Sequence, residues 1–331
     1  MSKALFTVAE VARLIKSGKT LALAGDERVL RQLPRGNWIG GTTPYFIGDA
    51  GGVCSRDLIH VAELGEAAQA GQIARYDARS IDRVYIDAAA AAYSLIIIPA
   101  RSPTHLRFAL GAPRFDRYAH RPLIGWIAGI HLDDLGKVAA LVFDGRSGEA
   151  IADGAVVLHA RLPKGKVAEL AILNIFEMGQ GPDIMFEKDG FEARDAVVGG
   201  ERVNLAKWLE EKQADARLPL VADYLGTRVN VSFQSVDTTA SVVRFYAPVF
   251  VGVTYRHARP VQDYAAQFTQ HVPADIGQVT FSCNCILNYL YSELEGKRTA
   301  AFTGPVTFGE IAYQLVNQTL AYLLLNDAVG T

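Results

Sequence analysis

The chain has 331 residues, enough for one large or two ordinary domains, and half of them are hydrophobic. Only 21% are charged, which leaves ample apolar surface for a packed core and excludes global disorder. The formal net charge is −2 and no long basic run occurs, so nucleic acid is not an expected partner. Three cysteines cannot build a disulfide framework, and this number favours a reducing compartment.

The N-terminal segment predicts a short amphipathic helix over Val8–Ser17. Thr7 and Glu10 have the spacing of a capping box, and Gly18 is a typical residue after a helix end. Charged residues interrupt the apolar positions, so the segment does not resemble a signal peptide. The apolar stretch "AAAAAYSLIIIPA" is too short to cross a bilayer. We therefore expect a cytoplasmic protein without membrane insertion.

Strands and short helices then follow one another with tight turns. A strand is expected at Thr20–Gly25, followed by a short helix that begins at Glu27. Tyr93–Ala100 is rich in β-branched residues and closed by proline, which is typical of a strand. Further strands are expected, in chain order, at Pro122–Leu132, Val138–Gly145, Gly154–Leu162 and Val167–Phe176.

The second half of the chain changes its pattern near residue 218. An amphipathic helix is predicted over Val203–Arg217, with Leu205 and Leu209 on its apolar face. After Leu218–Pro219 the chain reads as closely spaced strands with few helices. We predict an α+β fold of two tightly packed domains, residues 1–217 and 218–331, each with a mixed or mainly antiparallel sheet flanked by helices.

The segment "FSCNC", Phe281–Cys285, places two cysteines one residue apart after a predicted strand. A structural zinc site needs four ligands, and the sequence offers no second pair. A disulfide between residues i and i+2 is strained, and a catalytic cysteine needs a nearby base that folding would have to supply. The simplest interpretation is a pair of small, reduced, buried side chains at a strand end. No metal is expected.

No cofactor is predicted either. Covalent c-type haem requires a CxxCH motif, which is absent. The alternative is haem held by a lone histidine such as His257. The simpler interpretation of His257 is a histidine at a strand end that binds no ligand.

Polar residues interrupt the apolar segment Gly304–Leu325. Glu310 stands between apolar neighbours, and Asn317 begins the polar run "NQT". Buried polar groups need partners or ligands, so an inward-facing Glu310 could hold an ammonium group or orient a water. The alternative is a glutamate that faces solvent or pairs with an arginine.

Three pieces of this region resemble the C-terminal domain of the FIST family: Ser282–Asn284, Phe308–Ile311 and Asn317–Leu320. The segment "WIGGTTPYF" is similar to a strand end of that family's N-terminal domain. The resemblance implies a divergent, stand-alone intracellular sensor that binds small ligands such as amino acids and signals through a partner protein. Cys285 and Ile286 depart from the glycine and arginine that the family usually has after Cys-Asn.

The sequence thus favours a non-catalytic sensory protein whose two domains enclose a pocket for an amino acid or small amine. The predicted lining residues are Thr42, Thr43, Cys283, Asn284, Glu310 and Asn317. One alternative is a FIST-like scaffold that acts through protein contacts, and homo-oligomerisation is left open. Another is a cysteine-dependent hydrolase or amidase that uses Cys283 or Cys285 with Glu310 or a histidine.

Overall fold

The computed structural model describes residues 3–65, 71–224, 227–273, 276 and 279–328. Within these ranges the chain forms seven α-helices and five mixed or antiparallel sheets, so the predicted α+β class is confirmed. Short 3₁₀ helices occur at Ile81–Arg83, Ala88–Ala90, Ala112–Arg114 and Leu132–Asp134 (η5). No helix of the described chain is both long and apolar enough to cross a membrane.

The first sheet is built by the N-terminal part of the chain. Helix α1 (Val8–Lys16) covers it and begins with the predicted capping box between Thr7 and Glu10. Helix α2 (Glu27–Leu30) follows its second strand. In spatial order the strands are β1 (Leu5–Phe6), β6 (Ile59–Glu63), β2 (Leu21–Gly25), β3 (Trp38–Thr42), β10 (Val142–Asp144) and β11 (Glu149–Ile151).

The second sheet places the apolar strand β8 (Tyr93–Pro99) at its centre. Leu95 and Ile97 pack into one core and Ile96 and Ile98 into another, so β8 is buried on both faces, which explains its unbroken apolar run. Helices α3 (Val84–Asp87) and α4 (Pro103–Gly111) cover one face. The spatial order is β26 (Gln314–Val316), β25 (Glu310–Ala312), β9 (Leu123–Ala128), β8, β12 (Ala155–Ala160) and β7 (Gln72–Tyr76).

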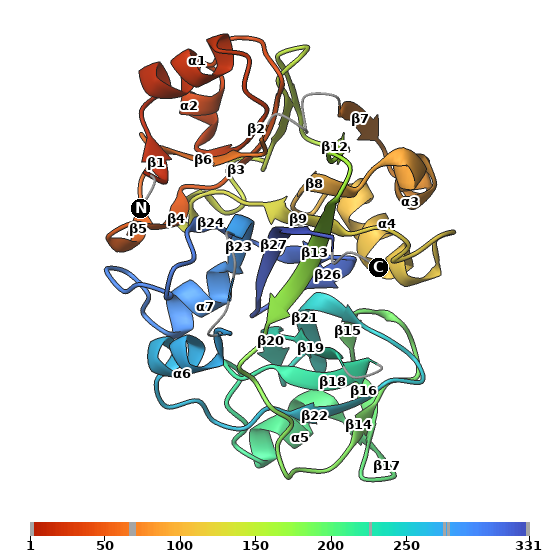
Figure 1. Cartoon of the computed structure of the whole chain (residues 1–331). Helices are drawn as coiled ribbons and strands as arrows, with labels where there is room; N and C mark the ends of the chain where they lie inside the picture. The colour runs from red at the N-terminus through yellow and green to blue at the C-terminus, as the bar shows by residue number, and fades with distance from the viewer. Residues whose placement is uncertain (1–2, 66–70, 225–226, 274–275, 277–278, 329–331) are drawn as a thin grey trace.

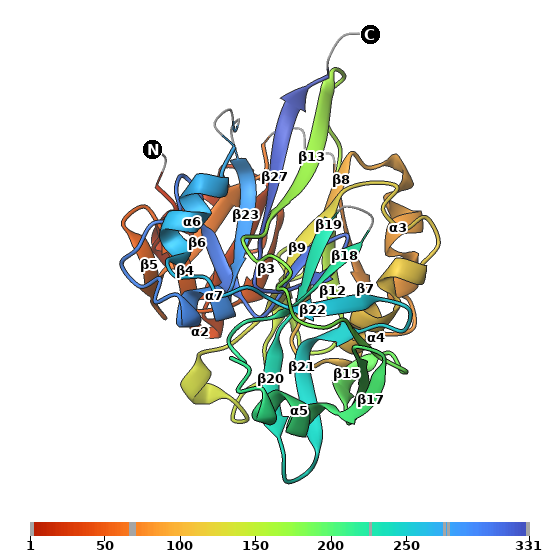
Figure 2. The ribbon, with the colours of Figure 1, turned by 90° about the horizontal axis from the view of Figure 1, so that it is seen from below.

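The third sheet contains the "FSCNC" segment, which ends a buried strand as predicted. Helices α6 (Tyr264–His271) and α7 (Ile286–Tyr291) lie beside this strand (Figure 2). The order is β13 (Lys166–Leu173), β27 (Leu320–Asp327), β23 (Val279–Cys285), β24 (Gly304–Thr307), β4 (Tyr45–Gly48) and β5 (Gly51–Cys54). Trp126 of the second sheet stacks on Phe281 of the third, with ring centroids 5.5 Å apart.

The remaining two sheets form a separate layer at the bottom of Figure 1, with its own core around Phe186 and Phe245. One sheet has the order β17 (Glu201–Asn204), β16 (Asp195–Val198), β14 (Ile184–Met185), β22 (Thr254–His257), β18 (Leu220–Tyr224) and β19 (Thr227–Val231). The other has the order β15 (Gly190–Ala193), β21 (Val242–Val249) and β20 (Phe233–Asp237). Helix α5 (Leu205–Glu211) packs on this layer.

Helix α5 is shorter than the predicted Val203–Arg217 at both ends. Val203 belongs to strand β17, because the Asn204 side chain accepts a hydrogen bond from the Lys207 N–H and caps the helix there. At the other end Gln213 takes a left-handed conformation with φ of 51°, which stops the helix. The expected strand at Val138–Gly145 is likewise reduced to Val142–Asp144.

Strands from both sides of residue 218 pair in every sheet except the first. Examples are β13 with β27, β4 with β24 and β9 with β25. The layer around α5 is instead built from residues 184–257. Strands of the two halves are therefore interleaved within the same sheets. The division into domains of residues 1–217 and 218–331 stays a prediction.

His159 lies in a buried polar chain within the second sheet. Its Nδ1 is 2.7 Å from the Ser94 hydroxyl, and its Nε2 is 2.9 Å from the Tyr76 hydroxyl. Tyr76 in turn donates to Asp87. Burial lowers the pKa of His159 from 6.5 to about 4, so this imidazole is neutral in the folded protein.

We predict that replacing His159 with glutamine reduces the loss of unfolding free energy that occurs as the pH falls below 6.5. The unfolded state binds a proton at the ordinary histidine pKa, whereas the folded state binds it only near pH 4. His159 therefore removes stability as the pH falls from 6.5 towards 4, by up to about 3 kcal/mol. Urea unfolding between pH 7.5 and 5 measures the slope. The exposed His120→Gln variant is the control, and equal slopes for both variants would contradict the prediction.

Candidate functional site

Glu310 lies in the interior of the protein and is fully buried. It belongs to β25, where it pairs with Trp126 of β9 on one side and Val316 of β26 on the other. Neither carboxyl oxygen has a hydrogen-bond partner among the described residues. An uncompensated buried carboxylate is unfavourable, and burial raises the pKa of Glu310 well above its usual value.

Cys285 and Thr319 lie beside the Glu310 carboxyl group. Their polar groups lower the pKa of Glu310 and so partly counter burial, although none reaches the geometry of a hydrogen bond. Burial, and then the neighbouring Glu310 charge, raise the pKa of the Cys285 thiol well above its usual value. The backbone N–H groups of Gln318 and Leu287 act in the opposite direction. Burial therefore favours the protonated form of both the thiol and the carboxyl group.

Two buried asparagines continue this polar cluster. Asn284 accepts hydrogen bonds from the Cys285 N–H at 2.8 Å and from the Asn288 amide at 2.9 Å. The Asn284 Nδ2 and the Asn288 Oδ1 have no partner among the described residues. The Tyr264 ring lies against this group, and burial followed by the Glu310 charge raises the pKa of its hydroxyl well above 10. The Tyr264 hydroxyl is thus close to Asn284, Asn288 and Glu310.

A cavity of about 210 Å³ adjoins the cluster. It is smaller than typical drug-sized sites of roughly 300–1,000 Å³ and therefore suits a small ligand. It lies between the main body and the layer around α5, because β15, β20 and β21 supply part of its wall. Its lining residues are Ala100, Arg101, His105, Leu132, Leu135, Phe191, Gln234, Phe245, Tyr246, Cys285, Ile286, Leu287, Leu290, Phe308 and Asn317.

Two hydrogen-bond donors in the cavity wall lack partners among the described residues. The Asn317 Oδ1 accepts from the Ser232 hydroxyl at 2.9 Å, but its Nδ2 is unpaired. The Nδ1 of His105 accepts from the Arg101 N–H at 3.2 Å, whereas its buried Nε2 is unpaired. Burial lowers the pKa of His105 to about 4, so the ring is neutral and its proton lies on Nε2.

The six residues predicted from the sequence are distributed over different places. Asn317 lines the cavity, while Glu310 is not among the lining residues and lies close to Cys285, which is one of them. Asn284 joins the cluster through its contacts with Cys285 and Tyr264. These three residues lie in one region of the structure.

Thr42, Thr43 and Cys283 have structural contacts and are not among the lining residues. The Thr42 hydroxyl accepts from the Leu141 N–H, and the Thr43 hydroxyl donates to the Val306 carbonyl. The Cys283 thiol donates to the Gly125 carbonyl at 3.2 Å within the central core. All three side chains bind a backbone group of a segment that is distant in the sequence.

His105, Cys285 and Tyr246 line the cavity but were not among the predicted ligand-binding residues. Cys285 was considered only as a nucleophile. His105 lies in the first turn of α4, three residues after its N-cap Ser102. Many unrelated helices begin in this way, so the local sequence does not indicate that His105 belongs to a site. Asn288 has a weak signal, because it stands four residues after Asn284.

No cluster of three or more histidine, cysteine or acidic side chains that could hold a metal ion occurs in the described part of the chain. The three cysteines are free thiols. His257, the residue considered for haem, has its Nε2 3.0 Å from the Asp215 carbonyl and its ring edge against Phe233. Its Nε2 is therefore already engaged.

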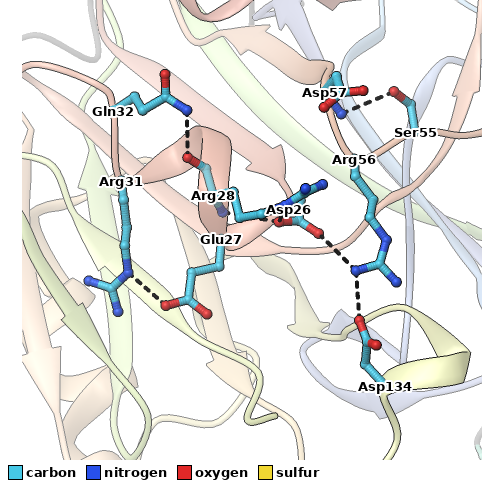
Figure 3. Close-up of polar contacts among 9 residues, drawn as sticks. All are labelled: Asp26, Glu27, Arg28, Arg31, Gln32, Ser55, Arg56, Asp57 and Asp134. Atoms are coloured by element: carbon cyan, nitrogen blue, oxygen red, sulfur yellow. Dashed lines mark hydrogen bonds and ion pairs between the residues drawn. The ribbon is translucent and has the colours of Figure 1, made fainter. Parts of the chain in front are cut away.

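The loop around η5 supplies Leu132 and Leu135 to the cavity wall. Arg56 holds this loop through an ion pair with Asp134 at 2.7 Å, and it also approaches Asp26 at 3.9 Å (Figure 3). The Arg56 guanidinium lowers the pKa of the Asp134 carboxyl below its usual value. The cavity wall is thus connected to the N-terminal sheet by a surface ion pair.

The fold and the site define an α+β protein with a small cavity whose lining residues include unpaired polar groups. Residues 6–326 match a family described as a family of unknown function, DUF6976, and the chain belongs to this family. None of the curated proteins compared with the chain matches it.

We predict that Glu310→Gln stabilises the ligand-free protein, and more so at higher pH. The folded state holds the Glu310 proton above pH 4.5, where the unfolded state releases it, so wild-type stability falls as the pH rises. A neutral amide removes this loss. A gain of about 1–2 kcal/mol would raise Tm by a few degrees. Calorimetry at pH 5 and pH 8 measures the difference, with the exposed Glu211→Gln as control; no increase with pH would contradict the prediction.

We also predict that Arg56→Ala loosens the η5 loop. The substitution removes both ion pairs of Arg56, so amide hydrogen exchange over residues 131–138 should become several-fold faster. Arg31→Ala is the matched control, because Arg31 pairs with Glu27 on α2 and does not touch the loop (Figure 3). Equal exchange in the two variants would show that the ion pair does not hold the loop.

Proposed function

We propose that this protein binds a small ligand in the cavity between its main body and the layer around α5, and that it serves as a sensor. The observation that carries the proposal is the set of buried, unpaired polar groups that belong to residues of the cavity wall and to the cluster next to it. Buried polar groups are nearly always satisfied in folded proteins, so each unpaired group in a native structure needs an explanation. A ligand that pairs with them supplies one.

The unpaired groups describe the ligand. The Asn317 Nδ2 and the His105 Nε2 are donors, and they suit a carbonyl or carboxylate oxygen. Arg101, also in the wall, favours a negative charge. The Glu310 carboxyl behind Cys285 favours a positive charge on the opposite part of the ligand. These features support an amino acid or a small amine with a carbonyl group.

A cationic ligand would couple binding to pH. Its charge favours the ionised form of Glu310, so binding would release the carboxyl proton that burial retains in the empty protein. Affinity would therefore rise with pH until the ligand amine itself loses its proton. The resemblance to the FIST family supports a sensory role, in which a partner protein reads the occupied state.

The test is a thermal-shift screen of amino acids and small amines, followed by titration calorimetry on the hits. We expect Glu310→Gln to weaken a cationic ligand by about 1.5 kcal/mol, roughly tenfold. This is the low end of the range for a bond to a charged group, because Glu310 is not among the residues that line the cavity. An uncharged analogue of the same ligand should keep its affinity, and Asn317→Ala should weaken both.

Glu211→Gln, on the exposed face of α5, is the matched control and should bind like the wild type. A screen without hits, or a hit whose affinity is the same in wild type, Glu310→Gln and Asn317→Ala, would contradict the proposal.

A further inference from the structure

Arg101 gives the cavity wall its charge. Among the described residues that line the cavity it is the sole Asp, Glu, Lys or Arg, and its side chain is exposed. The guanidinium makes no ion pair and no hydrogen bond within the described part of the chain. The neutral His105 ring in the same wall adds no charge. The accessible wall is therefore suited to a single negative charge.

The backbone of Arg101 fixes the place of this charge. Arg101 has φ of 63°, a left-handed conformation that is unfavourable for a residue other than glycine. Its N–H donates to the His105 Nδ1 at 3.2 Å, which holds the residue at the start of α4. Unfavourable backbone conformations persist where the surrounding structure determines them, and they are frequent at ligand sites. The fold thus specifies the position of Arg101 as well as its charge.

A neutral donor lies next to the guanidinium. Tyr246 of β21 lines the same cavity, and its hydroxyl has no hydrogen-bond partner within the described ranges. Burial raises the pKa of this hydroxyl and the Arg101 guanidinium lowers it, so the two groups lie close together. The hydroxyl keeps its proton at neutral pH and is available as a donor. A guanidinium fork beside an O–H group matches the two oxygens of a carboxylate.

The rest of the accessible wall is apolar. Leu132 and Leu135 come from the η5 loop, Leu290 comes from α7, Phe191 from β15 and Phe308 from the segment after β24. Each of these five side chains keeps part of its surface accessible. A ligand that fills the cavity therefore needs an apolar body, and the phenylalanines suit a flat or branched one.

Apolar side chains also continue from the cavity onto the surface. Leu135 is 42% exposed and Leu290 is 41% exposed, although both line the cavity. Val138 in the η5 loop and Tyr291 at the end of α7 are exposed as well. Half of the large apolar side chains that the described surface exposes lie on these two segments. Apolar surface gathered beside a cavity is typical of a binding site.

We propose that the ligand of this cavity is a monocarboxylate with an aromatic or branched apolar body. The proposal rests on the proposed function and states what that ligand must contain. Its carboxylate contacts the Arg101 guanidinium and the Tyr246 hydroxyl, and its apolar body packs against Phe191, Phe308 and Leu290. A single guanidinium balances one negative charge, which favours a carboxylate over a doubly charged phosphate. Apolar amino acids belong to this class of ligand.

The carboxylate end of the ligand matters more than an amino group. Arg101 is among the lining residues, whereas Glu310 is not. Phenylalanine and hydrocinnamate, which lacks the amino group, should therefore bind with similar affinity. Hydrocinnamamide, which has no charge, should bind about tenfold more weakly, the low end of the range for hydrogen bonds to a charged group, because Arg101 is exposed to solvent.

Titration calorimetry on the full chain with hydrocinnamate and hydrocinnamamide tests the contact with Arg101. Arg101→Gln should weaken hydrocinnamate about tenfold and leave the amide unchanged. Arg101→Lys keeps the charge but not the fork, so it should retain part of the affinity. Added salt should weaken the acid and not the amide. Arg121→Gln is the matched control, because Arg121 is exposed, has no ion pair in the described chain and does not line the cavity.

Leu290→Ser tests the apolar body of the ligand. The substitution removes apolar surface from the cavity wall, so it should weaken the acid and the amide alike by several-fold. Leu106→Ser is the control, because Leu106 is 50% exposed on α4 and does not line the cavity. Both leucines are exposed, and unfolding curves verify that the variants are folded.

The proposal is overturned if acid and amide bind the wild type equally, if Arg121→Gln weakens the acid as much as Arg101→Gln, or if Leu290→Ser has no effect. Phenethylamine separates these results from the proposed function. A wild type that binds phenethylamine but not hydrocinnamate, with an amine affinity that falls in Glu310→Gln, leaves ligand binding in place and refutes the carboxylate ligand. No binding of acid, amide or amine contradicts both proposals.

Discussion

The pairing of β25 with β9 is the constraint on which the site depends. Its register sets Ile311 opposite Gly125 and Glu310 opposite Trp126. Because successive residues of a strand face opposite sides, this register sends Ile311 into the core under α4 and Glu310 to the other side, towards Cys285. A shift by one residue would exchange the two side chains and remove the buried acid.

The polar cluster around Glu310 lowers the stability of the folded state. Its carboxyl oxygens, the Asn284 amide nitrogen and the Thr319 hydroxyl are buried without partners among the described residues, while the surrounding strands are apolar. Each such group costs about 1–3 kcal/mol relative to a satisfied one. Proteins tolerate such losses mainly where function requires them, and the cluster adjoins the cavity. The energetically unfavourable polar groups therefore lie next to the cavity.

Local features of the sequence predicted local structure. The capping box at Thr7, the buried strand Tyr93–Pro99 and the strand end at Cys285 all follow from neighbouring residues. Glu310 and Asn317 could also be identified, because polar residues within an apolar segment need partners wherever the chain folds. Their proximity follows from the short hairpin of β25 and β26.

The rest of the site depends on contacts between distant segments. Thr42 and Thr43 follow a glycine-rich strand, but their hydroxyls bind backbone groups of β24 and the segment before β10, which no local pattern reveals. His105 and Tyr246 reach the cavity only because the layer around α5 packs against α4. Sequence periodicity describes which face of an element is buried, and not which distant element covers it.

The interleaved sheets determine when the chain can fold during its synthesis. Strands β24, β25 and β27 occupy interior positions, and each pairs on one side with a strand from the first half of the chain. The second and third sheets therefore stay incomplete until residues beyond 304 have left the ribosome. Until then β4, β9 and β13 each expose an unpaired edge, and β9 carries the apolar side chains of the central core. Such edges associate readily with other chains. A nascent chain of this topology therefore needs protection from aggregation for most of its translation, and a ribosome that stalls before β24 releases a product without a closed core.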